Sequence, residues 1–357
     1  GGGETNQTRA SLPSVQFRGG LSGSFYHFFN ANERTNMEAA ANLALTILPG
    51  RPFSIDITEE FGRSVRPFAD TSPAVRASQA RIDNQAGVTF NFATPGEILR
   101  IRLGYQLGLN FFEATEFHYG NRMTHTVSLG ETFRFLPQTA LVHDFSLMYA
   151  DYFNPMAGSA ASLVNDGALI RTRAGLNGAI TNTFSVLGVV GYAAGFYSSA
   201  ASYDMEYESV VAQVEARWQI MANMRLAFGY DRDFFPSFIG NFYRRDRGYV
   251  NYQLLIGGQF LLGAEVSLGY YEFGSIVRPD GMTPVGNTLT RGDVRFQGSL
   301  FAEYRFTEWL GANATFSYMG NFTDYIYNVP VVGTPTFTPD PAQFNKVQLW
   351  AGVRVFY

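Results

Sequence analysis

The sequence has no cysteine, and its only lysine is Lys346. Without cysteine, the chain has no disulfide framework, no thiol catalysis and no cysteine-ligated metal site. Charged residues make up only 16% of the chain, against about 25% in an ordinary globular protein. The formal net charge is −4, so the overall charge gives no reason to expect a nucleic-acid partner.

Long apolar runs are also scarce. The mean hydropathy is −0.06, too polar for a bundle of membrane helices that each need about 20 apolar residues. Aromatic residues nevertheless make up 16% of the 357 residues, and there are 37 glycines. So aromatic a chain is not disordered. A transmembrane β-barrel fits this composition, because lipid-facing and water-facing residues alternate and their hydropathies cancel.

Alternation along the sequence supports the barrel. Between residues 99 and 111, every odd position is apolar, while the even positions are Arg, Gly, Gln and Asn. Side chains alternate faces along a strand, so this pattern predicts one apolar and one polar face. The same alternation recurs at 210–220, 294–306 and 346–357.

Turn signals recur about every 43 residues, and each period holds two alternating segments and one longer polar loop. Short turns at one end and long loops at the other are typical of outer-membrane barrels. The turn signals are Pro49-Gly50, Pro95-Gly96, Pro137-Gln138, Thr181-Asn182, Ala222-Asn223, Leu261-Leu262 and Thr307-Glu308. The longer loops are 66–80, 153–165, 233–246, 274–292 and 320–343.

We therefore predict an all-β, antiparallel outer-membrane barrel of about 16 strands, with both termini in the periplasm. A further hairpin within 320–343 would make 18 strands. The predicted strands are 14–29, 37–48, 52–65, 81–93, 97–112, 122–135, 140–152, 167–180, 184–197, 208–220, 224–233, 246–260, 263–273, 292–306, 309–319 and 344–357.

Two other folds share part of this pattern. A β-propeller shares the repeat length, but its blades pack four short strands into that length. A transmembrane helix at 184–202 would contain three glycines and would leave the other alternating segments unexplained.

Residues 13–357 are predicted to form a single barrel domain behind a polar tail at 1–12. The tail lacks the features of a signal peptide, which predicts a mature chain. The last ten residues, QLWAGVRVFY, alternate up to a terminal aromatic. This resembles the signal by which the barrel assembly machinery recognises outer-membrane proteins, so we expect that machinery as a partner.

No catalytic constellation is evident, and we expect neither an enzyme nor a cofactor or metal site. His125 and His143 fall on the apolar parity of neighbouring strands. They could form a metal pair or supply the histidine of a lipase, but an interfacial, aromatic-like role is favoured. Glu59 and Glu60 are adjacent on one strand and must point to opposite faces. Glu131 falls on the lipid-facing parity, which suggests a bulge or a subunit contact.

The functional hypothesis rests on the charged residues at the alternating positions predicted to face the lumen. A self-neutralising network and a basic wall that attracts anionic solutes are both open interpretations. The candidate binding residues are Arg100, Arg102, Arg171, Arg173, Arg217, Arg225, Arg295, Arg305 and Arg354; Arg18, Arg134 and Lys346 share their parity. The acidic residues of that parity are Glu38, Asp56, Glu60, Asp144, Glu215, Asp231, Glu265 and Glu303.

The segment 231–247, DRDFFPSFIGNFYRRDR, concentrates charge and aromatic residues. It could form a ligand-binding mouth, although a cluster of salt bridges at the rim is favoured.

Three segments resemble the family of outer-membrane barrels named β-barrel porin 2: RFLPQTALVHDFSL (134–147), LIRTRAGLNGAITNTFSVLGVVGYAAG (169–195) and RLAFGYDRDFFPSFIGNFYRRDRGYVNYQ (225–253). The resemblance extends from about residue 35 to the C-terminus. It implies a Gram-negative outer-membrane location, passage of a secreted polysaccharide as the function, and a periplasmic export protein as a partner. Two alternatives stay open: a general small-solute porin, and a structural or adhesion anchor with a closed lumen.

Overall fold

The computed structural model describes residues 14–28, 34–64, 80–153, 165–198, 206–237, 240–276, 284–330 and 337–355. The strands are β1 (Val15–Phe28), β2 (Arg34–Ile47), β3 (Phe53–Ser64), β4 (Arg81–Ala93), β5 (Leu99–Phe112), β6 (Arg122–Leu136), β7 (Thr139–Tyr152), β8 (Gly167–Ala179), β9 (Phe184–Tyr197), β10 (Tyr207–Met221), β11 (Met224–Pro236), β12 (Phe242–Ile256), β13 (Phe260–Phe273), β14 (Arg291–Arg305), β15 (Leu310–Phe322), β16 (Ile326–Pro330), β17 (Phe337–Pro341) and β18 (Phe344–Val355).

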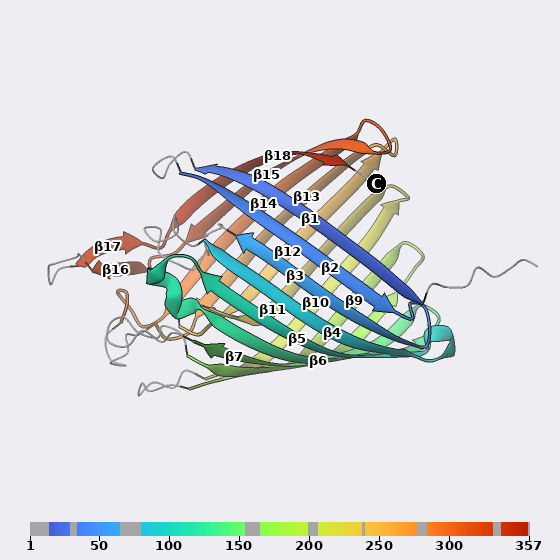
Figure 1. Ribbon diagram of the computed structural model, residues 1–357, viewed down its shortest axis with the longest axis horizontal. Helices are drawn as coiled ribbons and strands as arrows, with labels where there is room; N and C mark the ends of the chain where they lie inside the picture. The colour runs from blue at the N-terminus through green and yellow to red at the C-terminus, as the bar shows by residue number, and fades with distance from the viewer. Residues whose placement is uncertain are drawn as a thin grey trace, which may run out of the picture.

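Sixteen of these strands form one antiparallel sheet in the order β1 to β15 and then β18. The sheet curls into a barrel of tilted strands (Figure 1). The alternative hairpin within 320–343 does form, as β16 and β17, but it makes a separate two-stranded sheet that projects beyond the strand ends. The barrel therefore has 16 strands, as predicted.

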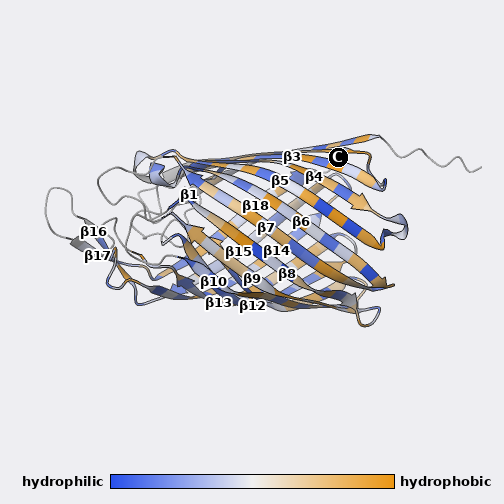
Figure 2. Cartoon of the chain, turned by 90° about the horizontal axis from the view of Figure 1, so that it is seen from below, coloured by the Kyte–Doolittle hydropathy of each residue, from blue (hydrophilic) through white to orange (hydrophobic). Residues whose placement is uncertain are grey.

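The alternation seen in the sequence separates the two faces of the barrel, and Figure 2 shows it as orange and blue residues along the strands. Leu103, Val214 and Leu300 belong to the exposed apolar surface on the outside. The residues between them, such as Gln213, face the lumen by the same alternation. This architecture is that of the transmembrane barrels of bacterial outer membranes. The end with short turns is the periplasmic end, and the end with long loops is extracellular.

The edge strands β1 and β18 form a seam. No β-ladder joins them within the part of the chain that the structure describes. Apolar side chains on both strands are among the most exposed in the barrel, including Leu21 at 89% and Leu349 at 75%.

The largest differences from the sequence prediction lie at one turn and one loop. The turn expected at Leu261-Leu262 lies at residues 257–259, where Gly257 and Gly258 adopt φ of 59° and 73°. Such left-handed conformations favour glycine, so the two glycines fix the turn. The loop expected at 233–246 is mostly strand, since β11 runs to Pro236 and β12 begins at Phe242.

Parts of several predictions lie outside the described residues: the tail at 1–12, most of the loops at 66–80 and 153–165, and the terminal Phe356-Tyr357. No helix in the described part of the chain is long and apolar enough to span a membrane.

Candidate functional site: the luminal arginines

The strand register places all nine predicted binding arginines on the luminal face, but at different heights. Arg171 and Arg295 lie towards the extracellular ends of their strands, and Arg173 lies nearer the middle. The other six lie within four residues of a periplasmic strand end: Arg100, Arg102, Arg217, Arg225, Arg305 and Arg354. The predicted site therefore divides into two groups with different surroundings.

The extracellular group is buried in ion pairs. Arg291 and Arg295 both bind Asp293, at 2.6 Å and 3.2 Å, and all three side chains are at most 5% exposed. Phe273 packs on both guanidinium groups, and its ring centroid lies 4.5 Å from Cζ of Arg291. The ion pairs lie within β14, and the stacking of the two arginines on Phe273 joins this strand to β13.

The same arrangement repeats on neighbouring strands of the extracellular half. Asp231 accepts hydrogen bonds from Arg245 at 2.6 Å and from Arg247 at 2.9 Å. Asp233 lies 3.1 Å from Arg171. These contacts agree with the interpretation of 231–247 as a cluster of salt bridges. Their carboxylates neutralise the local arginines.

The periplasmic group is exposed to the lumen. We define the periplasmic arginine ring as Arg18, Arg100, Arg102, Arg134, Arg217, Arg225, Arg305 and Arg354, which face inward near the periplasmic ends of β1, β5, β6, β10, β11, β14 and β18. Its ion-paired side chains are 40–54% exposed. In contrast, the ion-paired arginines of the extracellular group are 0–29% exposed.

Acidic partners of this ring are few. Arg18, Arg102 and Arg225 have no carboxylate partner among the described residues. Glu97, in the turn before β5, lies 2.9 Å from Arg100 and 3.7 Å from Arg134. The ring consequently keeps a net positive charge that luminal water and solutes can reach.

Elsewhere in the ring, Glu303 is shared. This carboxylate is 2% exposed and lies 3.4 Å from Arg305 and 2.8 Å from Arg354. It is covered by the two arginines, whose guanidinium groups remain open to the lumen.

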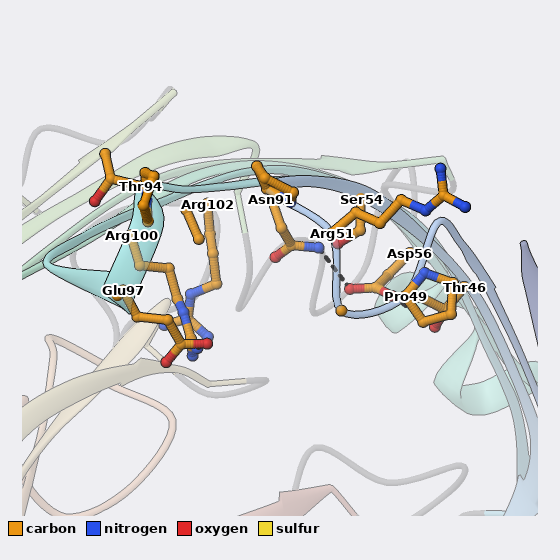
Figure 3. Close-up of a pocket in the computed structure, with 15 residues that line it drawn as sticks. Thr46, Pro49, Arg51, Ser54, Asp56, Asn91, Thr94, Glu97, Arg100 and Arg102 are labelled. Atoms are coloured by element: carbon orange, nitrogen blue, oxygen red, sulfur yellow. Dashed lines mark hydrogen bonds and ion pairs between the residues drawn. The ribbon is translucent and has the colours of Figure 1, made fainter. Parts of the chain in front are cut away.

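A hollow of about 520 Å³ lies against the ring at β3 to β5. Figure 3 shows Arg100, Arg102 and Glu97 projecting from one side of it, with Asp56 on the other. Asp56 accepts hydrogen bonds from Thr46 at 2.7 Å and from Asn91 at 2.7 Å. Its carboxylate is thus held by neutral donors on its own wall, and of the two arginines only Arg100 pairs with a carboxylate, that of Glu97.

A second hollow of about 360 Å³ contains Arg217 and Arg225. Glu215 and Glu265 line it as well, so this part of the ring is closer to neutral. Glu215 pairs with Arg217 and also accepts a hydrogen bond from Tyr249.

Aromatic side chains gather near the extracellular end of the barrel. Tyr207 packs against Phe234 and Phe242, with ring centroids 4.6 Å and 4.9 Å apart. Val211 and Phe234 are at most 1% exposed in the same cluster. Asn241, between β11 and β12, bonds to the backbone N–H of Asn165 at 2.9 Å. The hairpin of β11 and β12 is therefore packed onto β8, β9 and β10 at this end.

Glu131 and both outward histidines form hydrogen bonds on the outer face. Glu131 lies 3.1 Å from Nδ1 of His143, whose Nε2 lies 3.0 Å from the Thr172 hydroxyl. His125 bonds to Tyr105 at 2.7 Å. Glu131 and His143 are direct cross-strand partners in regular register, so the expected bulge at Glu131 is wrong.

The two histidines have different partners and form no pair. The described residues contain no cluster of three or more His, Asp or Glu suited to a metal ion.

Among the described side chains, five luminal arginines were missed by the sequence prediction: Arg81, Arg122, Arg245, Arg247 and Arg291. Arg245 and Arg291 lie one residue before predicted strands, and the other three lie inside predicted strands whose alternation was not followed to the extracellular end. Three luminal acids, Asp83, Asp233 and Asp293, were missed for the same reason. Following the alternation to the ends of the predicted strands would have found all of these residues except Arg245 and Arg291.

No protein-family model and no curated protein sequence matches the chain. Solved structures do resemble it. The apoprotein form of the FrpB iron transporter from Neisseria meningitidis aligns with 87% of this chain and 58% of its own, at 10% identity and a TM-score of 0.52. The siderophore receptor PiuA from Acinetobacter baumannii aligns with 95% of this chain and 65% of its own, also at 10% identity and a TM-score of 0.52.

The chain thus spans less than two thirds of the length of these transporters. At this identity, the likeness establishes the fold and leaves the solute open.

Proposed function

We propose that this protein is an outer-membrane channel through which a secreted polysaccharide leaves the cell. The observation that carries the proposal is the periplasmic arginine ring, because exposed polar side chains around an entrance suit a hydrated solute. In this proposal the barrel is a passive conduit without catalytic activity, and it receives the polymer from a periplasmic export protein.

A barrel of 16 strands supports the proposal, because barrels of this size leave an aqueous channel unless a segment fills them. The luminal parity is polar along most strands, with Gln, Ser, Thr, Asn and Arg between the outward apolar residues. Hydroxyls, amides and guanidinium groups can exchange hydrogen bonds with sugar hydroxyls. The resemblance to the β-barrel porin 2 family agrees with this choice of solute.

Deletion of the gene is the direct test. We expect the mutant to lose extracellular polymer while its periplasm accumulates it, and we expect a copy of the gene on a plasmid to restore secretion. Unchanged polymer in the medium would contradict the proposal.

A small-solute porin is the second candidate, and the aromatic packing of the β11–β12 hairpin favours it. Aromatic side chains near one mouth would narrow the passage for a chain of sugars. Uptake of small nutrients or antibiotics should fall in the deletion mutant if this function holds, with no change in secreted polymer.

A further inference from the structure

We infer that the periplasmic arginine ring is a docking site for an acidic polysaccharide, one that carries carboxylates along its length, and that the polymer enters the barrel from the periplasmic side. This inference rests on the proposed function and adds the charge of the polymer and its direction of travel.

Luminal arginines are paired and buried at the extracellular end of the lumen and exposed at the periplasmic end. At the extracellular end, Asp231, Asp233 and Asp293 each bind one or more arginines, and the pairs are largely withdrawn from water. At the periplasmic end, eight arginines face the lumen with five carboxylates near them, those of Asp56, Glu97, Glu215, Glu265 and Glu303, and the ion-paired arginines there are 40–54% exposed. The positive field is therefore concentrated at the entrance that a polymer leaving the cell meets first.

The chemistry of the ring suits carboxylates. A guanidinium group can donate two parallel hydrogen bonds to one carboxylate, which a lysine cannot do. Arg100 and Arg102 lie two residues apart on one face of β5, so their positions are separated by about 7 Å along the strand. Successive acidic sugars of an extended chain could engage both.

Space for the second guanidinium is provided by the neighbouring strand. A Cβ atom built on Gly130 would lie only 3.3 Å from Nη2 of Arg102. Glycine at this position therefore lets the Arg102 side chain lie across β6. This close approach orients an arginine that has no carboxylate partner among the described residues.

Weak individual contacts suit passage. Each exposed pair between a guanidinium and a carboxylate contributes up to roughly fivefold in affinity. Several such contacts around a ring retain a polymer at the mouth, yet each breaks readily as the chain advances.

Ion-current block in planar bilayers tests the inference. The full chain is inserted in one orientation, and oligogalacturonate is added to one side at a time, with a neutral dextran of equal length as the control solute. We expect oligogalacturonate to block at lower concentration from the periplasmic side. Equal block from both sides, or equal block by dextran, would overturn the inference and leave passage of polysaccharide intact.

A binding measurement separates the site from the channel. Labelled oligogalacturonate is titrated onto the detergent-solubilised protein by fluorescence anisotropy. We expect the double variant Arg100→Gln, Arg102→Gln to bind about tenfold more weakly, since two exposed contacts are removed. The matched control, Arg122→Gln with Arg245→Gln, removes the same charge from the extracellular half and should bind as the wild type does.

The outcomes are distinguishable. Loss of affinity in both double variants, or in neither, would overturn the inference whether or not the channel conducts. The opposite result is also possible: the ring binds oligogalacturonate as expected, but deletion of the gene leaves secretion unchanged. That result would contradict the proposed function.

Discussion

The assignment of the two faces can be tested at Val214, the central residue of β10. Val214 is 51% exposed on the outer face, and its cross-strand neighbours are Gly188 and Tyr230. We propose to replace it by arginine and to compare it with Gln213→Arg, one position along the same strand and directed into the lumen.

The expected loss of folding free energy follows from the depth of Val214 in the membrane. A strand tilted by about 45° advances roughly 2.3 Å along the membrane normal per residue, so an apolar band of about 25 Å spans some five residues on each side of its centre. Val214 has seven residues of β10 on each side and lies near the middle of that band. Arginine at the midplane of a barrel costs about 2–4 kcal/mol in folding free energy.

Gln213→Arg should be far milder. Its register partners are Val189 and Asp231, so the new guanidinium would be in the aqueous lumen close to a carboxylate. A change within about 1 kcal/mol is expected for an exposed charge of this kind. Urea titrations of folding into lipid vesicles measure both variants. Equal losses at the two positions would refute the assignment of the faces.

Three further predictions concern the outer face, the rim and the seam. His143→Leu should destabilise the barrel by about 2–3 kcal/mol because it leaves the Glu131 carboxylate without its partner, and the double variant with Glu131→Leu should regain most of that loss in the same urea titration. The hydrogen bond from Arg63 at 2.5 Å lowers the pKa of Glu113. The wild type should therefore be more stable than Glu113→Gln at neutral pH, and this difference should disappear as the pH falls below about 4. Parallel curves of unfolding free energy against pH for the two proteins would contradict this prediction. Unpaired strand edges are not tolerated in lipid, so β1 and β18 should pair in the membrane. A cysteine at Ser22 should then form a disulfide with at least one of the cysteines introduced one at a time along β18. The absence of every such cross-link would show that the seam stays open.

The strands were predictable because alternation has a period of two residues and survives moderate errors in the boundaries. The predicted range for β4, 81–93, agrees with the structure, and most others agree within three residues. The failure at 246–260 has a local cause. Charge and aromatics in DRDFFPSFIGNFYRRDR suggested a loop, but the arginines and aspartates pair across β11 and β12 and stabilise strand there.

Which residues pair across neighbouring strands could not be predicted from the sequence. The parity of Glu131 marked it as outward, yet its partner depends on the register of β6 against β7, which aligns Glu131 with His143. A shift of one residue would have placed another residue opposite it. Likewise, parity identified Arg100 and Arg295 as luminal, but only the register shows that the first faces open water and the second is stacked on Tyr271 at 4.2 Å.

Stability does not account for two members of the periplasmic arginine ring, Arg102 and Arg225. In buried pairs such as Arg291 with Asp293, removing one partner would leave an uncompensated charge. Arg102 and Arg225, in contrast, have no carboxylate partner in the described chain, and their like charges repel the rest of the ring. A glutamine at either position would keep a polar luminal surface without that repulsion. Arg102 and Arg225 thus have no evident role in stabilising the fold, and their place at the periplasmic mouth agrees with the proposed docking of an acidic polymer.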